Sequence, residues 1–174
     1  MGFEIVKRAN VVPVSPALAA LDGLVEEGYH VARLVTCGES VSQQYFNNDG
    51  TPKVSFVWDV EVYNDNGTNA RVRLWTGQSL HEKSYTNHLA RAIYKLGDTI
   101  EVGFKFDTDD CLGRPFRILL DVEQIEVDGV STPVNRPNKP YVFKAFNGTS
   151  PFDTFDAKVW ATVDVPADDD EIPF

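Results

Sequence analysis

Arg71, Arg73 and Trp75 are the residues of this chain whose types and spacing best fit chemistry with a ligand. They alternate with apolar residues over positions 70–76, and a period of two places them together on the outer face of a half-buried strand. A large indole beside two guanidinium groups is unusual for a plain protein surface. It suits single-stranded nucleic acid, because bases stack on aromatic rings while cations follow the phosphates. Binding of this kind is largely independent of base sequence and is sensitive to salt.

Other aromatic and basic residues are expected near this strand. With the three residues above they form the predicted nucleic-acid-binding set: Tyr63 on the preceding strand, Tyr45, Phe46 and Lys53 from the loop between the first two strands, and Arg114 and Arg117 at the loop between the last two. Asp59 and Glu61 share the face of Tyr63 and would repel phosphate. In an alternative interpretation, Trp75 is covered by residues 128–163 or by a second subunit.

Catalytic and metal-binding patterns are weaker, and none of them points to an enzyme. His30, His81 and His88 show no partner nucleophile or carboxylate at a useful spacing. The aspartates within 107–110 could hold a divalent cation, but acids in a loop between strands are usually a solvated turn. No phosphate-binding loop, GxSxG or HExxH pattern occurs. We therefore expect no catalysis, no cofactor and no metal.

Hydrophobic periodicity predicts the elements that must position these residues. Strands are expected at 29–36, 53–63, 70–76, 100–106 and 116–122, with turns at 47–50 and 64–67. The pattern from Ser79 to Glu82 is a capping box that would begin a helix, and Gly97 is placed to end it. Trp58 is expected in the core, because its neighbours on the same face are apolar. A short helix is expected after Ser15, and residues 128–163 could add strands or cover one end of the fold.

This order of elements predicts a mainly β protein. Three strands, a helix and two strands fit an OB-fold, a five-stranded Greek-key barrel with one helix between strands 3 and 4. Other small barrels have the same number of strands. The domain would span residues 1–163, with the barrel at about 29–127 and extensions at both termini. Ligands of OB barrels lie across strands 2 and 3 and between two loops, where the predicted set falls.

The net charge of −10 argues at first against bulk attraction to nucleic acid, but the acids are unevenly placed. Residues 164–174 carry five acids and no base, which is half of the excess. This tail cannot pack its charges and is predicted to be a disordered segment that contacts other proteins. No apolar run is long enough to span a bilayer, and the N-terminus lacks a secretory pattern. Cys37 and Cys111 have no disulfide or zinc spacing, so the expected compartment is a reducing cytoplasm.

The tail ends in a block of acids followed by an apolar tip: Asp168, Asp169, Asp170, Glu171, Ile172, Pro173 and Phe174. An apolar tip of this kind can enter a pocket whose basic rim pairs with the acids. The tip resembles the C-terminal tip of bacterial single-stranded DNA-binding proteins. The body, from Gly28-Tyr29-His30-Val31 through residues 79–84 to Val122, resembles small phage-encoded proteins of that kind.

The resemblance implies an OB-fold protein that coats single-stranded DNA, without sequence specificity, during replication, recombination or repair. Residues 168–174 would recruit host or phage enzymes, and a phage-encoded protein would work in the host bacterial cytoplasm. Bacterial members carry a long Gly/Gln/Pro-rich linker before the tip, whereas here only a short segment follows Trp160. The tail therefore has less reach. The resemblance leaves the number of subunits open, including a homo-oligomer.

Two other functions fit parts of the sequence. The first is a decoy or DNA mimic that captures host DNA-processing enzymes without binding DNA, which the net charge favours and the aromatic-basic strand disfavours. The second is a recombination mediator that anneals complementary strands. Titration with a single-stranded oligonucleotide separates the first of these from a DNA-binding protein, and a strand-annealing assay separates the second from simple coating.

Overall fold

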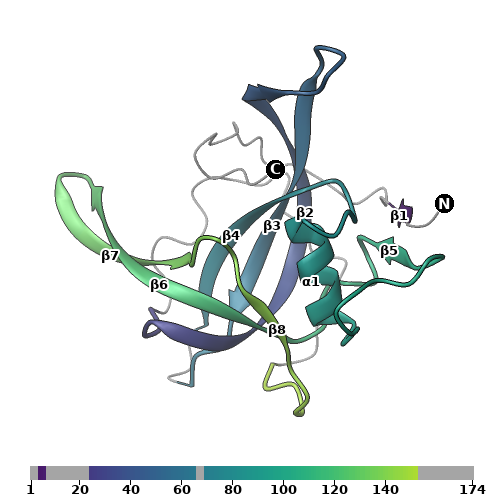
Figure 1. The fold of residues 1–174 in the computed structure, drawn as a ribbon. Helices are drawn as coiled ribbons and strands as arrows, with labels where there is room; N and C mark the ends of the chain where they lie inside the picture. The colour runs from purple at the N-terminus through teal and green to yellow at the C-terminus, as the bar shows by residue number, and fades with distance from the viewer. Residues whose placement is uncertain (1–3, 7–23, 66–68, 153–174) are drawn as a thin grey trace.

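The computed structural model describes residues 4–6, 24–65 and 69–152, and its architecture is mainly β as the sequence predicted. Six strands form the main sheet: β2 (Gly28–Phe46), β3 (Pro52–Val62), β4 (Ala70–Gly77), β6 (Phe116–Val127), β7 (Val130–Pro137) and β8 (Phe143–Ala145). Their order is β4-β3-β2-β6-β7, and β8 pairs with β6. A second, small parallel sheet joins β1 (Glu4–Val6) to β5 (Lys105–Asp107). The helix α1 (Tyr85–Ile93) lies beside the main sheet (Figure 1).

The first hairpin is longer than the sequence predicted. β2 is 19 residues long and continues through residues 37–46, which the polar composition had suggested was a loop. The predicted turn at 47–50 is confirmed, because the amide of Gly50 donates to the carbonyl of Asn47 at 3.0 Å. The far ends of β2 and β3 therefore form an arm that stands away from the rest of the sheet (Figure 1). We call residues 41–54 the β2–β3 arm.

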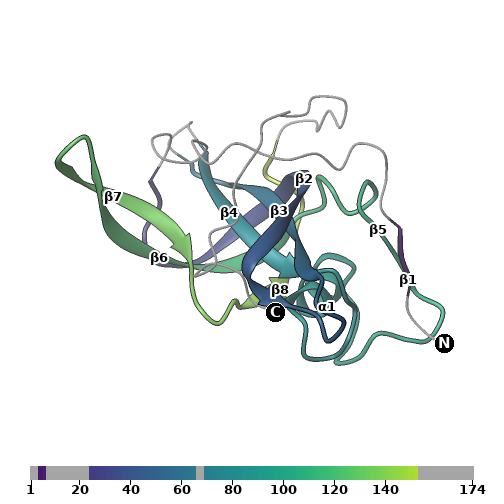
Figure 2. The ribbon, with the colours of Figure 1, turned by 90° about the horizontal axis from the view of Figure 1, so that it is seen from above.

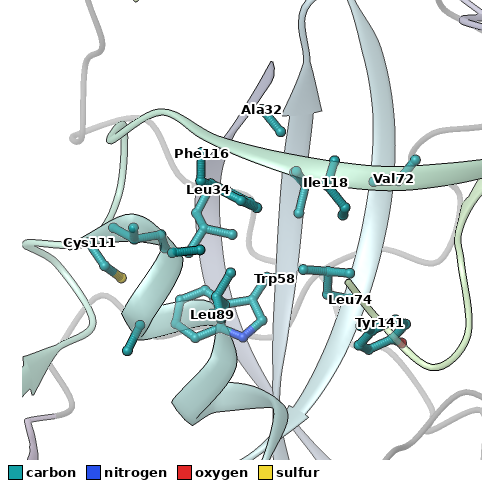
Figure 3. Packing of buried hydrophobic residues seen from close by; sticks show 14 of the residues in the cluster. Ala32, Leu34, Trp58, Val72, Leu74, Leu89, Cys111, Phe116, Ile118 and Tyr141 are labelled. Carbon is teal, nitrogen blue, oxygen red and sulfur yellow. The ribbon is translucent and has the colours of Figure 1, made fainter. Parts of the chain in front are cut away.

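The core lies on one face of the sheet, with Trp58 at its centre. Phe56, Trp58, Val60 and Val62 alternate along β3 and are fully buried, so the predicted core position of Trp58 is confirmed. The indole Nε1 of Trp58 donates to Thr76 Oγ1 at 2.8 Å, which satisfies its one polar atom. Figure 3 shows side chains from several strands and Leu89 of α1 converging on this residue. Each such side chain stabilises the fold by about 1.5–3 kcal/mol through burial.

The helix begins later than the capping-box pattern predicted. Its N-cap is Ser84, whose hydroxyl accepts the amide of Asn87 at 3.1 Å, rather than Ser79. The helix also ends earlier, at Tyr94, and Lys95 rather than Gly97 adopts the left-handed conformation, with φ of 56°. The physical reason is local: Leu80 is buried in the core, so residues 79–83 form an irregular loop ahead of the helix.

Replacing Ser84 with alanine should lower the free energy of unfolding by about 1 kcal/mol, because the amide of Asn87 loses its cap. Chemical denaturation measures the loss. Ser79→Ala is the matched control, since the hydroxyl of Ser79 accepts only the exposed amide of His81 and is expected to cost less than half as much. Equal losses for the two variants would contradict the assignment of Ser84 as the N-cap.

The predicted fourth strand is wrong, whereas the predicted fifth strand is confirmed and is longer than predicted. Residues 100–106 do not form a strand of the main sheet, and only Lys105–Asp107 is extended, paired with β1. The chain turns at Gly103, whose φ of 95° suits glycine, so Val102 is exposed although its sequence pattern is strand-like. The fourth strand of the main sheet in chain order is β6, which is longer than the predicted 116–122.

Residues 128–137, which the sequence left undecided, form the turn and second strand of a hairpin with β6. Asp128 and Gly129 both have positive φ, at 51° and 79°, as an Asp-Gly turn of the hairpin type requires. This β6–β7 hairpin extends away from the rest of the protein (Figure 2). β7 also contacts β4, although the two strands are not hydrogen-bonded neighbours in the sheet.

Two predictions fall outside the described residues: the short helix after Ser15 and the disordered tail at 164–174. The predicted hairpin around residues 64–67 is supported at its ends, because β3 and β4 pair from Val62 with Ala70 onward. Among the described residues, no helix is both long and apolar enough to cross a membrane.

Candidate nucleic-acid interface

Arg71, Arg73 and Trp75 lie on the side of β2, β3 and β4 turned away from the core, as the alternation predicted. We call this side the outer face. Arg73 forms an ion pair with an acid of the neighbouring strand. Arg73 Nε lies 3.1 Å from Asp59 Oδ1, and both side chains are more than nine-tenths buried. Asp59 of β3 therefore neutralises the charge of Arg73 on β4. From the sequence, Asp59 was predicted only to repel phosphate.

A second ion pair continues the row of charges. Arg33, on β2, places its Nε 2.7 Å from Glu61 Oε1. A bulge at Val35 shifts the register, so Thr36 also reaches the outer face and donates to Asp59 at 3.0 Å. Arg71 lies opposite Glu61 in the register of β3 and β4 and is half-buried. Arginines and acids thus alternate across this part of the sheet.

Burial and hydrogen bonding move the pKa values of the two acids in opposite directions. Burial raises the pKa of Asp59, and the nearby Arg73 and the hydroxyl of Thr36 offset this only in part. Burial would also raise the pKa of Glu61, but hydrogen bonds from Asn69 and Arg33 outweigh it, and the pKa is lowered. The folded protein therefore disfavours the charged form of Asp59 and favours the charged form of Glu61.

The pKa of Asp59 predicts a pH-dependent difference between wild type and Asp59→Asn. The folded state holds the proton of Asp59 more tightly than the unfolded state, where the ordinary value is 3.8. The contribution of Asp59 to stability is therefore complete below pH 3.8 and is lost as pH rises through the folded pKa. Unfolding free energies at several pH values between 3 and 7 should show wild type losing stability relative to Asp59→Asn. A relative gain with rising pH would contradict the assignment.

Trp75 corrects the expectation of an exposed stacking platform. Trp75 is 6% exposed in the single chain and lies beside the fully buried Val57, its cross-strand partner. Neither residue belongs to the main core cluster around Trp58. Tyr63 is also engaged: its ring meets that of Phe152 edge-on at 6.0 Å, and the guanidinium of Arg33 lies 4.6 Å from the centre of the Phe152 ring. A base could not stack on Trp75 or Tyr63 without moving other groups.

The β2–β3 arm instead carries exposed aromatic side chains. Phe46 is 54% exposed and Tyr45 38% exposed, both close to the turn. The turn itself is held by Asp49, which accepts the amide and hydroxyl of Thr51 at 3.0 and 2.6 Å. These hydrogen bonds from Thr51 lower the pKa of Asp49. Two aromatic rings are thus presented to solvent on a well-defined hairpin end.

A groove of about 480 Å³ lies between this arm and the loop that joins β4 to α1. Its lining contains two lysines, one histidine and no acid: Asn47, Lys53, Val54, Gly77, Gln78, Ser79, His81, Lys83 and Ser84. No acid is among these lining residues, although the side chain of one of them, Gln78, donates to the carboxylate of Glu39 at 2.5 Å. Lys53 was predicted as a binding residue, whereas His81 and Lys83 were not.

Hydrogen bonds shape the loop on the far side of the groove. Ser79 Oγ accepts the amide of His81 at 3.0 Å, and the amide of Lys83 donates to His81 Nδ1 at 3.2 Å. Ser84 Oγ donates to the carbonyl of Ser79 at 2.5 Å. The loop therefore holds His81 and Lys83 in place across from Lys53. The polar stretch 78–84 contains both His81 and Lys83. The capping-box pattern predicted the start of a helix there, so neither residue was predicted to line a binding site.

Arg114 and Arg117 are not brought to this groove. Arg114 lies in the loop before β6, where its Nη2 is 3.0 Å from Asp110 and its guanidinium is 5.0 Å from the ring centre of Tyr94. Tyr94 donates to the same carboxylate at 2.8 Å, and burial raises the pKa of its hydroxyl. Arg117 Nε donates to the carbonyl of Ala145 at 3.0 Å. These two arginines serve the β5–β6 loop and the β6–β8 pair.

The aspartates at 107–110 form a turn, as the simpler interpretation held. Asp107 Oδ1 accepts the amide of Asp109 at 2.8 Å and that of Asp110 at 3.3 Å. Within the described ranges, no group of three potential metal ligands lies close enough to hold an ion. Cys111, beside this turn, is buried, and burial raises the pKa of its thiol, which disfavours the reactive thiolate.

The predicted partner-binding residues 168–174 lie outside the described residues. The described part of the chain thus offers one open, basic and partly aromatic region, formed by the β2–β3 arm and the groove beside it. No family model, no curated protein and no solved structure matches the chain. The choice of this region as the candidate interface therefore rests on its geometry.

Proposed function

We propose that this protein binds single-stranded DNA without sequence preference, along the groove and the β2–β3 arm. The observation that carries the proposal is the acid-free groove lined by Lys53, His81 and Lys83, next to the exposed rings of Tyr45 and Phe46. Lysines neutralise phosphates, and aromatic rings stack with any base. No enzymatic activity is part of the proposal.

The strand order supports an OB-like fold for this function. β2, β3 and β4 precede the helix, and β6 and β7 follow it, so the sheet order corresponds to strands 3-2-1-4-5 of a five-stranded barrel. The contact between β4 and β7 is where such a barrel would close. In OB-folds the connection between the first two strands contributes to ligand binding, and here that connection is the β2–β3 arm.

We further propose that the C-terminal tip recruits enzymes of replication, recombination or repair to the coated strand in the cytoplasm. The acids at 168–171 and the apolar residues 172–174 suit a pocket with a basic rim. This part of the proposal rests on the sequence and on the resemblance of the tip to that of bacterial single-stranded DNA-binding proteins.

A fluorescent oligo-dT titration in 50 mM salt tests the DNA-binding function. Phe46→Ala should weaken binding by about 1–3 kcal/mol, because one stacking surface is lost. Val130→Ala is the matched control: Val130 is also largely exposed, but it lies at the tip of the β6–β7 hairpin. Wild-type binding that is micromolar or weaker, or equal losses for the two variants, would count against the proposal.

The decoy function has one structural observation in its favour. The arginines Arg33 and Arg73 of the outer face are paired with acids, so this face gives no surplus of positive charge. A decoy would leave the oligonucleotide unbound at every salt concentration while still capturing DNA-processing enzymes through its tip. The same titration therefore decides between the two functions.

A further inference from the structure

Residues 83–97, which comprise α1 and the residues at its two ends, contain several basic side chains and no acid. Lys83, Arg91 and Lys95 give this stretch a formal charge of +3, whereas the whole chain carries −10. The acids closest to it in the sequence are Glu82 and Asp98, one on each side. A local surplus of positive charge on an acidic protein favours contact with an anionic ligand.

The basic side chains lie along the helix and at both of its ends. His88 and Arg91 are three residues apart, so they share one helical face. Lys83 lies immediately before the N-cap, and Lys95 lies immediately after the C-cap, Tyr94. Both lysines are exposed, and the other two basic side chains are half-buried. We call residues 83, 88, 91 and 95 the α1 stripe.

The lysines and the arginine of the α1 stripe keep their charge available to a ligand. Within the described ranges, the ion pairs join other residues. Arg91 Nε donates to the neutral side chain of Asn87 at 2.9 Å, which orients the guanidinium without cancelling its charge. Asp110 approaches the helix at Tyr94, but its carboxylate lies 3.0 Å from Arg114 Nη2. The α1 stripe thus differs from the outer face, where two arginines are paired with acids.

Helix stability alone does not account for the α1 stripe. The dipole of a helix favours acids in the first turn and bases in the last turn. Arg91 in the last turn follows this rule, but the first turn has no acid. Lys83 moreover places a positive charge at the end of the helix where a negative charge is favoured. A bound anion would offset this unfavourable arrangement.

The α1 stripe continues the basic lining of the groove. Lys83 and Ser84 line the groove, and Ser84 is also the N-cap of α1. From there the helix leads away from the β2–β3 arm for nine residues, about 14 Å (Figure 1). We propose that a single strand bound in the groove continues along α1, with its phosphates on Lys83, Arg91 and Lys95. This inference rests on the proposed DNA binding and extends the bound strand beyond the groove.

The α1 stripe offers contacts to phosphates and none to bases. The ring of Tyr85 packs against that of Tyr141 at a centroid distance of 4.8 Å, and the ring of Tyr94 packs against that of Phe104 at 5.4 Å. His88 Nε2 donates to a backbone carbonyl at 3.2 Å. Because these rings are already engaged, the stripe acts through charge, and its contribution is measured by the salt dependence of binding.

Oligo-dT of two lengths separates the groove from the α1 stripe. Strands of about 4 and about 16 nucleotides bracket the lengths that single OB domains bind. Arg91→Gln combined with Lys95→Gln should leave the affinity for the short strand within about twofold of wild type, because that strand occupies the groove. For the long strand, the salt slope should fall by about 0.7 to 1.4, and binding in 50 mM salt should weaken about 8- to 60-fold.

Two further variants control this experiment. Lys105→Gln combined with Lys144→Gln removes the same charge from exposed lysines of β5 and β8, and it should change the slope for neither strand. Lys95→Gln alone guards against misfolding, because Lys95 is exposed and lies beyond the end of the helix. This single variant should fold as wild type does and show about half of the reduction in slope for the long strand.

The outcomes distinguish this inference from the proposed function. Equal slopes for wild type and the Arg91/Lys95 variant with the long strand would overturn the inference alone, if loss of the groove lysine Lys53 still lowers the slope. A stripe that serves an acidic protein instead would give this result. Equal losses for the short and long strands would also overturn the inference, because the stripe would then not extend the contact. Absence of wild-type binding to both strands would overturn the inference and the proposed function together.

Discussion

Trp58→Ala should lower the free energy of unfolding by about 3–5 kcal/mol, the largest stability loss expected for a single substitution in this chain. The indole is fully buried and packs against the rings of Phe56 and Phe106, at centroid distances of 5.2 and 6.0 Å. Alanine leaves a cavity between β3 and α1 that the rigid sheet cannot fill. It also removes the donor to Thr76 Oγ1. Urea denaturation followed by circular dichroism measures the loss.

Two variants show whether the loss has the stated cause. Trp58→Phe retains most of the ring but not the donor, so it should cost clearly less than alanine. Phe46→Ala removes an aromatic ring that is more than half exposed and should change stability by no more than about 0.5 kcal/mol. A loss below about 1 kcal/mol for Trp58→Ala would show that the core is not organised around this residue.

Strict alternation predicted the central strands well. Phe56, Trp58 and Val60 on β3 can be buried together only if their neighbours point outward, so the pattern determines both the strand and the face. The helix at Tyr85–Ile93 was predicted for a similar reason, through its apolar face. Its start was not, because Ser79 and Ser84 are both good caps and only the tertiary burial of Leu80 decides between them.

The errors arose where neighbours in space, rather than in sequence, decide the outcome. The alternation at 100–106 is broken by the turn at Gly103, a conformation that a period-two pattern does not reveal. Trp75 was placed on the correct face, but its cover depends on contacts across that face. Arg73 was expected to be available to phosphate, whereas Asp59 on the adjacent strand binds it. The groove joins residues 47–54 to 77–84, and only the fold brings them together.

Loss of the two groove lysines should produce the largest effect on DNA binding. Each phosphate contact with a single strand contributes about 0.7 to the dependence of log K on log salt. Lys53→Ala combined with Lys83→Ala should therefore reduce that slope by about 1.4 and weaken binding by about 60-fold in 50 mM salt. Lys105→Ala combined with Lys144→Ala is the control, because these exposed lysines lie on β5 and β8, away from the groove lining.

The salt dependence of oligo-dT binding, measured for wild type, the groove double variant and the control double variant, tests the central claim most directly. The account predicts tight wild-type binding, a slope reduced by about 1.4 in the groove variant, and an unchanged slope in the control. Equal slopes for wild type and the groove variant, or no wild-type binding at low salt, would contradict the claim that the groove beside the β2–β3 arm binds single-stranded DNA.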